Sequence, residues 1–451
     1  KRIDDLLTGQ LLRAVGALGS GPVVPDFDRE AFNAELQRFD FQSPRPLEDV
    51  LRWTVERMAH GIVHVNHPRY FGLFNPSPTF PSQCADRIAA AFNPQLASAT
   101  TSPVAVAIEA HTVSAIAARA GLPSSSFGHF TTAGSEANLT ATLCALTDAC
   151  ADYARAGARA FSGAPAFYVS RDSHLAWIKI GHQTGIGRGA ARMIPTDGRG
   201  RISVSALKEA IRADRAEGRV PFMIAATAGT TNAGMVDPLP ACAEIARAEG
   251  LWYHVDAAWG GAALASPRLA PLLKGIGEAD SVTIDAHKWF ATTMGCGMYI
   301  TSRPELLTAA FHTSANFMPP SGALLDPYVS TVQWSRRFAG LRLFLALAAG
   351  GWQSYADHVE RSAALAKELA EKLEGSGWHI VNEPLLGVVC ARPPGEAEDV
   401  RALAGRVVAG GRAWISAASF EGRDVIRACV SNGESTRDDV EALVAALCAA
   451  L

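Results

Sequence analysis

A lysine stands at the end of a short apolar run, where its amine could act as a nucleophile. Residues 281–290 read SVTIDAHKWF, so that His287 and Lys288 closely follow a run expected to be a buried strand. A buried ammonium group is costly unless it is paired or loses its proton. The neutral amine is the form that attacks a carbonyl carbon to make a Schiff base, so Lys288 is a candidate for that chemistry. The alternative is a lysine whose ammonium group reaches back into water.

A carboxylate follows a second strand-like run. Residues 252–261 read WYHVDAAWGG, in which Asp256 comes directly after the apolar residues and is followed by small ones. A carboxylate at that place can keep the nitrogen of an aromatic ring protonated, and Ala258 leaves room for a flat ring. An aspartate that caps a helix or a turn is the simpler alternative.

Small residues in the stretch FTTAGSEANL, residues 130–139, are typical of a turn that opens a helix. The free N–H groups at the start of a helix attract phosphate, which makes Ala133, Gly134 and Ser135 candidate phosphate ligands. The stretch is neither a GxxxxGK(S/T) loop nor a GxGxxG motif, so ATP and NAD are disfavoured. A helix cap without a ligand is the alternative.

Two further strand-like runs lead into loops with polar side chains. In residues 170–179, SRDSHLAWIK, His174 follows a predicted strand, and its neutral imidazole could lie over an aromatic cofactor. In residues 225–234, AATAGTTNAG, Thr231 lies in a loop of glycine and threonine residues. A hydrogen-bonded structural histidine and an ordinary turn are the alternatives at these two places.

The elements expected to position these residues alternate along the middle of the chain. Helical segments are separated by short apolar runs, a pattern typical of an α/β sheet with parallel strands and both faces covered. The predicted strands are Ala166–Ser170, Phe222–Ala226, Trp252–Val255, Ser281–Ile284 and Gly297–Ile300. The predicted helices include Ser135–Ala156, Ser203–Glu217 and Leu239–Glu249.

The pattern changes towards both ends of the chain. The first part reads as amphipathic helices, and after Arg337 a long predicted helix, Leu341–Leu373, leads into the short strands and helices of a smaller α+β unit. We therefore expect three parts. They are a helical N-terminal segment (residues 1–78), a large α/β domain that holds the five motifs (79–340) and a small C-terminal α+β domain (341–451).

The composition of the 451 residues predicts a soluble globular protein. Lys plus Arg, 41, nearly balances Asp plus Glu, 44, and the net charge of −3 offers no surface for nucleic acid or an anionic membrane. No apolar run approaches the roughly 18 residues that span a bilayer. The eight cysteines include no CxxC pair and the first residues lack the apolar core of an export signal, so we expect free thiols, no metal site and a cytoplasmic location.

In chain order, the phosphate-binding turn, the histidine, the threonine loop, the aspartate and the lysine form a combination far more specific than any one of them. It resembles the fold-type I, aspartate aminotransferase-like pyridoxal-phosphate enzymes. More narrowly, it resembles the group II amino-acid decarboxylases, which include aromatic-L-amino-acid, histidine, glutamate and cysteine-sulfinate decarboxylases. The spacing of 32 residues from Asp256 to Lys288 fits that family. Further matching segments are HPRYFG at 67–72, SP at 102–103, SRRF at 335–338 and RACVSN at 427–432.

The resemblance implies pyridoxal 5'-phosphate as the cofactor and a role for each motif. Lys288 would form the Schiff base, Asp256 would pair with the ring nitrogen and His174 would stack on the ring. The remaining contacts would come from Ala133, Gly134 and Ser135 at the phosphate, His287 beside it, Ala258 on the other ring face, and Thr231 near O3′ or the substrate carboxylate. The family also implies a homodimer in which the partner subunit completes the active site.

The implied activity is decarboxylation of an L-amino acid to the amine and CO2, which requires the bond to the carboxylate to stand perpendicular to the cofactor ring. By resemblance, the substrate pocket would consist of Tyr70, Leu73, Phe74 and Pro76. These side chains are mostly apolar, so they favour an aromatic or otherwise apolar substrate. If Arg69 and His312 point inward, glutamate or aspartate becomes the alternative substrate.

One departure from the family bears on the product. The aromatic branch carries a loop tyrosine thought to protonate the reacting carbon, and the alignment puts Phe317 at its place. In plant relatives a phenylalanine there accompanies aldehyde synthesis, in which decarboxylation is coupled to oxidative deamination by O2. Simple decarboxylation is the favoured hypothesis and aldehyde synthesis the alternative, with Tyr328 as a possible substitute for the tyrosine. An aminotransferase, in which Arg427 would bind the substrate carboxylate, is disfavoured by the motif context.

Overall fold

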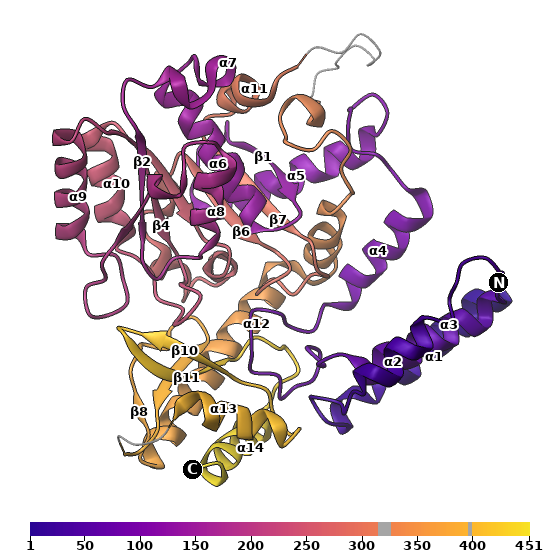
Figure 1. Ribbon diagram of the computed structural model, residues 1–451. Helices are drawn as coiled ribbons and strands as arrows, with labels where there is room; N and C mark the ends of the chain where they lie inside the picture. The colour runs from indigo at the N-terminus through magenta and orange to yellow at the C-terminus, as the bar shows by residue number, and fades with distance from the viewer. Residues whose placement is uncertain (314–325, 396–398) are drawn as a thin grey trace.

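The computed structural model describes residues 1–313, 326–395 and 399–451. A seven-stranded sheet forms its centre, a four-stranded sheet lies beside it, and a helical arm extends at the N-terminus (Figure 1). The α-helices are α1 (Arg2–Gly16), α2 (Arg29–Leu36), α3 (Leu47–Gly61), α4 (Phe80–Phe92), α5 (Pro103–Ala120), α6 (Gly134–Ala149), α7 (Tyr153–Ala156), α8 (Ala176–Gln183), α9 (Val204–Ala216), α10 (Leu239–Glu249), α11 (Glu305–Phe311), α12 (Gly340–Gly375), α13 (Val400–Ala409) and α14 (Arg437–Ala449). The predicted α/β architecture, with a large mostly parallel sheet, a small α+β part and an N-terminal helical segment, is confirmed.

The large sheet has the strand order β1-β7-β6-β5-β4-β2-β3. In chain order its strands are β1 (Phe127–Thr131), β2 (Pro165–Ser170), β3 (Ala191–Ile194), β4 (Val220–Thr227), β5 (Trp252–Asp256), β6 (Ser281–Asp285) and β7 (Gly297–Thr301). β7 is antiparallel to both of its neighbours, and every other neighbouring pair is parallel. All the strands of this sheet except β7 therefore end at the same edge.

Two apolar cores cover the two faces of this sheet. On β2, Phe167 and Val169 pack into the core that contains α6 and α8, whereas Tyr168 between them belongs to the core beneath α5, α9 and α10. Successive side chains of a strand point to opposite faces, so a strand covered on both sides is apolar throughout. This is why the central strands read as continuous apolar runs in the sequence.

Several elements differ from the predictions. β1 was not predicted because Gly128 and His129 interrupt its apolar character, and β3 was not predicted because it is a short edge strand. β7 is antiparallel because residues 286–296, which join it to β6, are too few for the helical crossover that a parallel strand requires. The predicted helix Ser135–Ala156 is interrupted at Cys150, whose backbone is extended.

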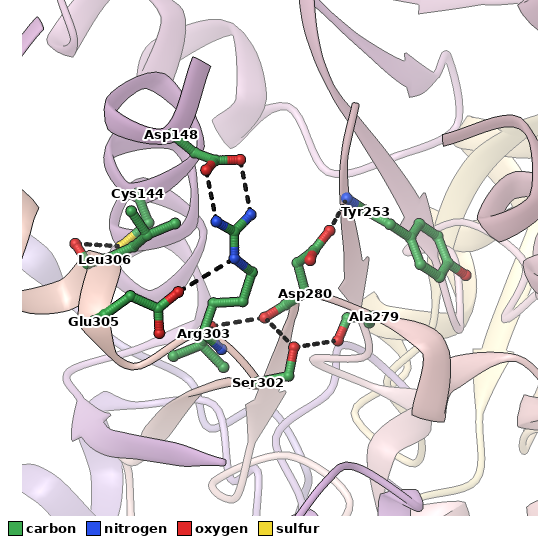
Figure 2. A network of polar contacts seen from close by, with 10 residues as sticks. Cys144, Asp148, Tyr253, Ala279, Asp280, Ser302, Arg303, Glu305 and Leu306 are labelled. Carbon is green, nitrogen blue, oxygen red and sulfur yellow. Dashed lines mark hydrogen bonds and ion pairs between the residues drawn. The ribbon is translucent and has the colours of Figure 1, made fainter. Parts of the chain in front are cut away.

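The C-terminal end of α6 is anchored at the edge of the sheet opposite to the strand ends. Arg303, just after β7, donates to both oxygens of Asp148 in the last turn of α6, at 2.8 and 2.7 Å, and also pairs with Glu305 (Figure 2). In the same network the Tyr253 N–H donates to Asp280 at 2.8 Å and fixes the start of β5. Because a helix is rigid over this length, its anchored end also fixes where its N-terminus lies.

The small sheet has the order β10-β11-β9-β8 and is antiparallel throughout. Its strands are β8 (His379–Ile380), β9 (Val388–Arg392), β10 (Ser416–Phe420) and β11 (Arg423–Cys429). β10, rich in serine and alanine and only partly buried, was not predicted. α12 bends at Gly351, where φ is +66°, and its second half packs with α13 and α14 on this sheet. The division of the chain at residues 78 and 340 stays a prediction.

The segment that follows the helical arm crosses to the small sheet. The Phe71 N–H donates to the carbonyl of Trp414 at 2.8 Å, and the Cys429 N–H donates to the carbonyl of Phe71 at 2.9 Å. The side-chain amide of Asn432 donates to the carbonyl of Asn66 at 3.0 Å. The N-terminal segment is therefore held by the C-terminal part of the chain, which brings the residues that follow it to the boundary between the two sheets.

None of the helices in the described part of the chain combines the length and the apolar character needed to cross a membrane.

Acid is expected to destabilise this fold through two histidines whose rings are shielded from water. Burial lowers the pKa of His254 and of His358 from 6.5 to about 4. Between these pH values the unfolded chain binds protons that the folded chain does not, so the free energy of unfolding falls as the pH falls. For each of these histidines, the free energy of unfolding falls by roughly 3 kcal/mol as the pH drops from above 6.5 to below 4. Urea unfolding midpoints at pH 7 and pH 5 measure the effect.

His358→Gln should make the midpoint less sensitive to pH, whereas His379→Gln, which replaces an exposed histidine, should not. A pH dependence unchanged in His358→Gln would contradict this assignment.

Candidate active site

Five segments of the sequence meet at one edge of the large sheet. His174, Asp256 and Lys288 follow or end strands β2, β5 and β6, which run in the same direction. The turn after β1 and the loop after β4 reach the same edge for the same reason. They surround a cavity of about 180 Å³. It is lined by Phe74, Ala133, Gly134, Ser135, Asn138, His174, Thr227, Gly229, Thr231, Asp256, Ala258, Trp259, Asp285, His287 and Lys288.

Lys288 forms an ion pair inside the cavity. Its Nζ lies 3.0 Å from Oδ2 of Asp285, whose side chain is only 3% exposed. The other oxygen of Asp285 is buried and has no hydrogen-bond partner among the described residues. A turn brings the two side chains together, because the Lys288 N–H donates to the carbonyl of Asp285 at 3.1 Å. Sequence reasoning assigned no role to Asp285, although its spacing of three residues from Lys288 at a strand end was a usable signal.

Asp256 is a buried carboxylate with two hydrogen-bond donors. Its Oδ2 accepts a hydrogen bond from the amide of Asn138 at 2.8 Å, and its Oδ1 accepts one from the N–H of Ala258 at 3.1 Å. Hydrogen bonds to the charged form stabilise a carboxylate as an anion. Asn138 was also missed from the sequence. Its place four residues after Gly134, on the same face of α6, could have indicated it.

Both histidines of the site carry their proton on Nε2. The Ala176 N–H donates to Nδ1 of His174 at 3.2 Å, and the Cys296 N–H donates to Nδ1 of His287 at 3.3 Å. Burial lowers the pKa of both side chains below 6.5, so both are neutral at neutral pH. A neutral imidazole at His174 can lie flat against an aromatic ring, while Nε2 of His287 lies 3.9 Å from Asp285.

The turn that opens α6 is tightly packed at its glycine. A Cβ atom on Gly134 would lie 2.9 Å from Oδ2 of Asp285 and 3.3 Å from Cβ of Ala258. Glycine therefore lets the helix start come close to the floor of the cavity. The first N–H groups of a helix have no partner within it, so they and the hydroxyl of Ser135 can receive an anion such as phosphate.

An aromatic stack forms one wall of the cavity. The ring of Phe74 stacks on Trp259 with centroids 4.0 Å apart, and Trp259 stacks on Trp289 at 4.8 Å. The Nζ of Lys288 lies 5.7 Å from the centroid of Phe74, and the guanidinium carbon of Arg427 lies 4.7 Å from it. Both cations are within the range of cation–π contacts. The wall beside Lys288 is therefore flat and apolar.

The cavity is not lined by Tyr70, Leu73 or Pro76, the other described residues named for the substrate pocket, nor by Tyr328, named as a substitute for the loop tyrosine. Their roles stay predictions. Tyr70 is buried and stacks on Trp414 with centroids 5.2 Å apart, and the side chain of Leu73 is half exposed. Tyr328 is buried against Trp334. Phe317 lies outside the described residues.

Arg427 joins the N-terminal segment to the loop after β4. Its Nε donates to the carbonyl of Thr231 at 2.9 Å, and its Nη1 donates to the carbonyl of Gly72 at 2.5 Å. Its Nη2 is buried and has no partner among the described residues. Arg69 instead pairs with Asp439 of α14, 3.0 Å away.

These residues fit pyridoxal 5'-phosphate. Lys288 offers an amine for the aldehyde, Asp256 a carboxylate for the ring nitrogen, and the start of α6 an anion site made close by Gly134. A mostly parallel sheet with this set of groups at its edge defines a fold-type I pyridoxal-phosphate enzyme. A profile of the pyridoxal-dependent decarboxylase conserved domain matches residues 31–393, and the chain belongs to this family. Its cofactor is pyridoxal 5'-phosphate, and its chemistry is that of a carboxy-lyase acting on an amino acid.

The chain is similar to several known decarboxylases. It is 29% identical over 437 residues to an aromatic-L-amino-acid decarboxylase of Bacillus atrophaeus, covering 94% of this chain and 89% of the relative. It is 32% identical over 364 residues to cysteine sulfinic acid decarboxylase of Mus musculus, covering 79% and 73%. The crystal structure of mouse CSAD superposes with a TM-score of 0.93 at 27% identity, covering 100% of this chain and 98% of that chain.

Lys288→Ala is expected to remove both the covalently held cofactor and turnover. No other lysine lines the described cavity, so the loss of activity should exceed about a thousandfold. Borohydride reduction of the loaded protein followed by peptide mass spectrometry measures the covalent link. Lys274→Ala, which removes an exposed lysine, is the matched control and should keep the adduct. An adduct that persists in Lys288→Ala would overturn the assignment.

Proposed function

We propose that this chain decarboxylates an L-amino acid with an aromatic or otherwise apolar side chain to the amine and CO2. The observation that supports this substrate class is the flat apolar wall of Phe74 and Trp259 beside Lys288. An apolar side chain packed there is stabilised by about 25 cal/mol for each Å² removed from water. A side-chain carboxylate would have to lose its hydration against the same wall.

Each residue of the cavity has a separate role in the proposed reaction. Lys288 binds the cofactor through its amine, the start of α6 with Ser135 holds the phosphate, and Asp256 keeps a proton at the ring nitrogen. The bound cofactor supplies a ring that accepts the electron pair left when CO2 departs. His174 covers the ring, and Phe74 excludes water from the reacting side. These side chains orient the substrate, and the orientation selects the bond between the α-carbon and the carboxylate as the one that breaks.

An acidic substrate is the second candidate. The relatives named above include one for aromatic amino acids and one for cysteine sulfinic acid, at similar identity. Arg69 is paired with Asp439, and His312 is exposed beyond α11. The free Nη2 of Arg427 is the group that favours this alternative, because a buried guanidinium N–H without an acceptor is costly and a carboxylate would satisfy it. In an aminotransferase, too, Arg427 would bind the substrate carboxylate, but the family found here is that of decarboxylases.

Aldehyde synthesis is the alternative for the product. It rests on Phe317 standing in the sequence where the aromatic branch has a tyrosine, in a segment outside the described residues. Without a proton donor at that place, the electron-rich carbon would persist long enough to react with O2.

A panel of L-amino acids incubated in air with the holoenzyme tests substrate and product together. We expect kcat/KM for aromatic and aliphatic substrates to exceed that for glutamate, aspartate and cysteine sulfinate by about tenfold or more, because only the former pack on the wall of Phe74. Amine should form without aldehyde or peroxide, as measured by mass spectrometry and a peroxide assay.

Two outcomes would contradict this proposal. Preference for an acidic substrate, lost in Arg427→Gln, would make the chain an acidic amino-acid decarboxylase. Aldehyde with stoichiometric peroxide, replaced by amine in Phe317→Tyr, would make it an aldehyde synthase.

We propose that the active protein is a homodimer. Helices α1, α2 and α3 bury none of their residues within the chain. Leu12 and Val15 on α1 are 70% and 51% exposed, and Met58 on α3 is 53% exposed. An amphipathic helix that leaves its apolar stripe open gains free energy by covering it, and a second copy of the chain is the partner that the family implies. The cytoplasm remains the proposed location, consistent with eight free cysteines.

Sedimentation should give a mass of twice 47.6 kDa for the holoenzyme. The double variant Leu12→Glu, Val15→Glu should weaken the dimer by about tenfold or more, because two charges would be buried at the interface. Leu385→Glu, which changes a residue 44% exposed on the small C-terminal part, is the control and should stay dimeric. A monomeric, active wild-type protein would contradict the proposal.

A further inference from the structure

A chain of buried side chains leads from the far end of β5 to the carboxylate at the cavity. The indole N–H of Trp252 donates to the hydroxyl of Ser281 at 2.9 Å, and this hydroxyl lies 2.8 Å from Nδ1 of His254. Nε2 of His254 lies 3.1 Å from Oδ1 of Asn138, whose amide nitrogen donates to Asp256 at 2.8 Å. All five side chains are at most 5% exposed.

The direction of each hydrogen bond in this series of side chains can be worked out from Asp256, its last member. Only the NH₂ group of Asn138 can face the carboxylate of Asp256, because the amide oxygen would be repelled by it. The amide oxygen must therefore face His254. Two acceptors 3.1 Å apart would also repel each other, so Nε2 of His254 carries a proton and donates it.

The other end of this series of side chains is compatible with the same direction. An indole nitrogen can only donate, so Ser281 accepts from Trp252 and keeps its own proton. With the ring proton on Nε2, Nδ1 of His254 is an acceptor, and the hydroxyl of Ser281 donates to it. Burial lowers the pKa of His254 to about 4, so the ring is neutral with one proton.

We propose that Asn138 is a positioning residue that donates a hydrogen bond to Asp256, so that the proton shared between this carboxylate and the bound cofactor stays on the ring nitrogen. This rests on the proposed pairing of Asp256 with that nitrogen. Trp252, Ser281 and His254 hold the amide of Asn138 in the one orientation that donates. Among the described residues, the one other side chain within hydrogen-bond distance of this imidazole is Thr283, whose hydroxyl lies 3.4 Å from Nε2 of His254.

The physical reason is competition for one proton. A carboxylate and a ring nitrogen that face each other share it according to their relative basicity. Donors on the carboxylate make it the weaker base, and Asp256 has two, the N–H of Ala258 and the amide of Asn138. Hydrogen bonds to a charged group are the strong ones in a buried site. Without Asn138 the proton moves towards Asp256, and the ring becomes a poorer acceptor of electrons.

Asn138→Leu, of similar size but without donor or acceptor, tests the proposal in the holoenzyme. Nitrogen-15 NMR of the protein loaded with ring-labelled cofactor reports directly whether the ring nitrogen is protonated. We expect its signal to shift towards that of the neutral ring, kcat to fall roughly 10- to 100-fold, and KM to change little. Ser281→Ala, at the far end of the chain, should cause a smaller shift in the same direction, and it carries the test if Asn138→Leu does not fold.

Thr142→Val is the matched control. Thr142 is buried one turn further along α6 and donates only to the backbone carbonyl of Asn138. This variant should keep the wild-type signal and kcat. A wild-type signal and kcat in folded Asn138→Leu, or in Ser281→Ala when it must stand in, would overturn the inference.

The proposed function can fail separately. If the wild-type ring nitrogen is unprotonated, Asp256 is not its partner and the inference falls, even if amine is formed. If the nitrogen responds to Asn138→Leu but no amino acid yields amine, the inference stands and the proposed function is wrong.

Discussion

Buried charge is the constraint on which the rest of this site depends. Lys288, Asp285 and Asp256 lie at the ends of two neighbouring strands whose surroundings are apolar, where an unpaired charge costs several kcal/mol. The fold meets this by pairing Lys288 with Asp285 and by giving Asp256 two donors. One of these donors, Asn138, comes from α6. Asp256 therefore has both of its donors only when α6 and the sheet are assembled together.

The same helix connects the two ends of the site. α6 starts at the tight turn of Gly134, supplies Asn138 one turn later, and is anchored at its far end by Asp148 and Arg303. An anion at its start and the donor for Asp256 thus share one rigid element. A cofactor that carries both a phosphate and a ring nitrogen would have to reach both places at once, so the two protein groups must keep a suitable separation. A single anchored helix provides that better than two loops would.

Sequence reasoning reached those parts of the site that are coded locally. A strand followed by a polar residue can be recognised in the sequence. The family resemblance then supplied the roles of Lys288, Asp256 and His174. Contacts between segments are not coded this way. Asn138 stands within a quoted motif, yet only the packing of α6 on β5 shows that it touches Asp256. Asp285 differs, because its partner Lys288 is only three residues away. Tyr70 stacks on Trp414 within this chain, and its place in the substrate pocket stays a prediction.

The residues proposed for the cofactor and those proposed for the substrate come from different parts of this molecule. The groups proposed to hold the cofactor come from the ends of the strands of the large sheet, from the turns and loops that follow them, and from α6, whose geometry the two apolar cores fix. Phe74 comes from the N-terminal segment and Arg427 from β11. The guanidinium group of Arg427 lies over the ring of Phe74 and donates to the carbonyls of Gly72 and Thr231. Such contacts can change without disturbing the sheet. The names of relatives near 30% identity divide between aromatic and acidic substrates, and we expect such differences to arise in contacts of this kind rather than in the sheet.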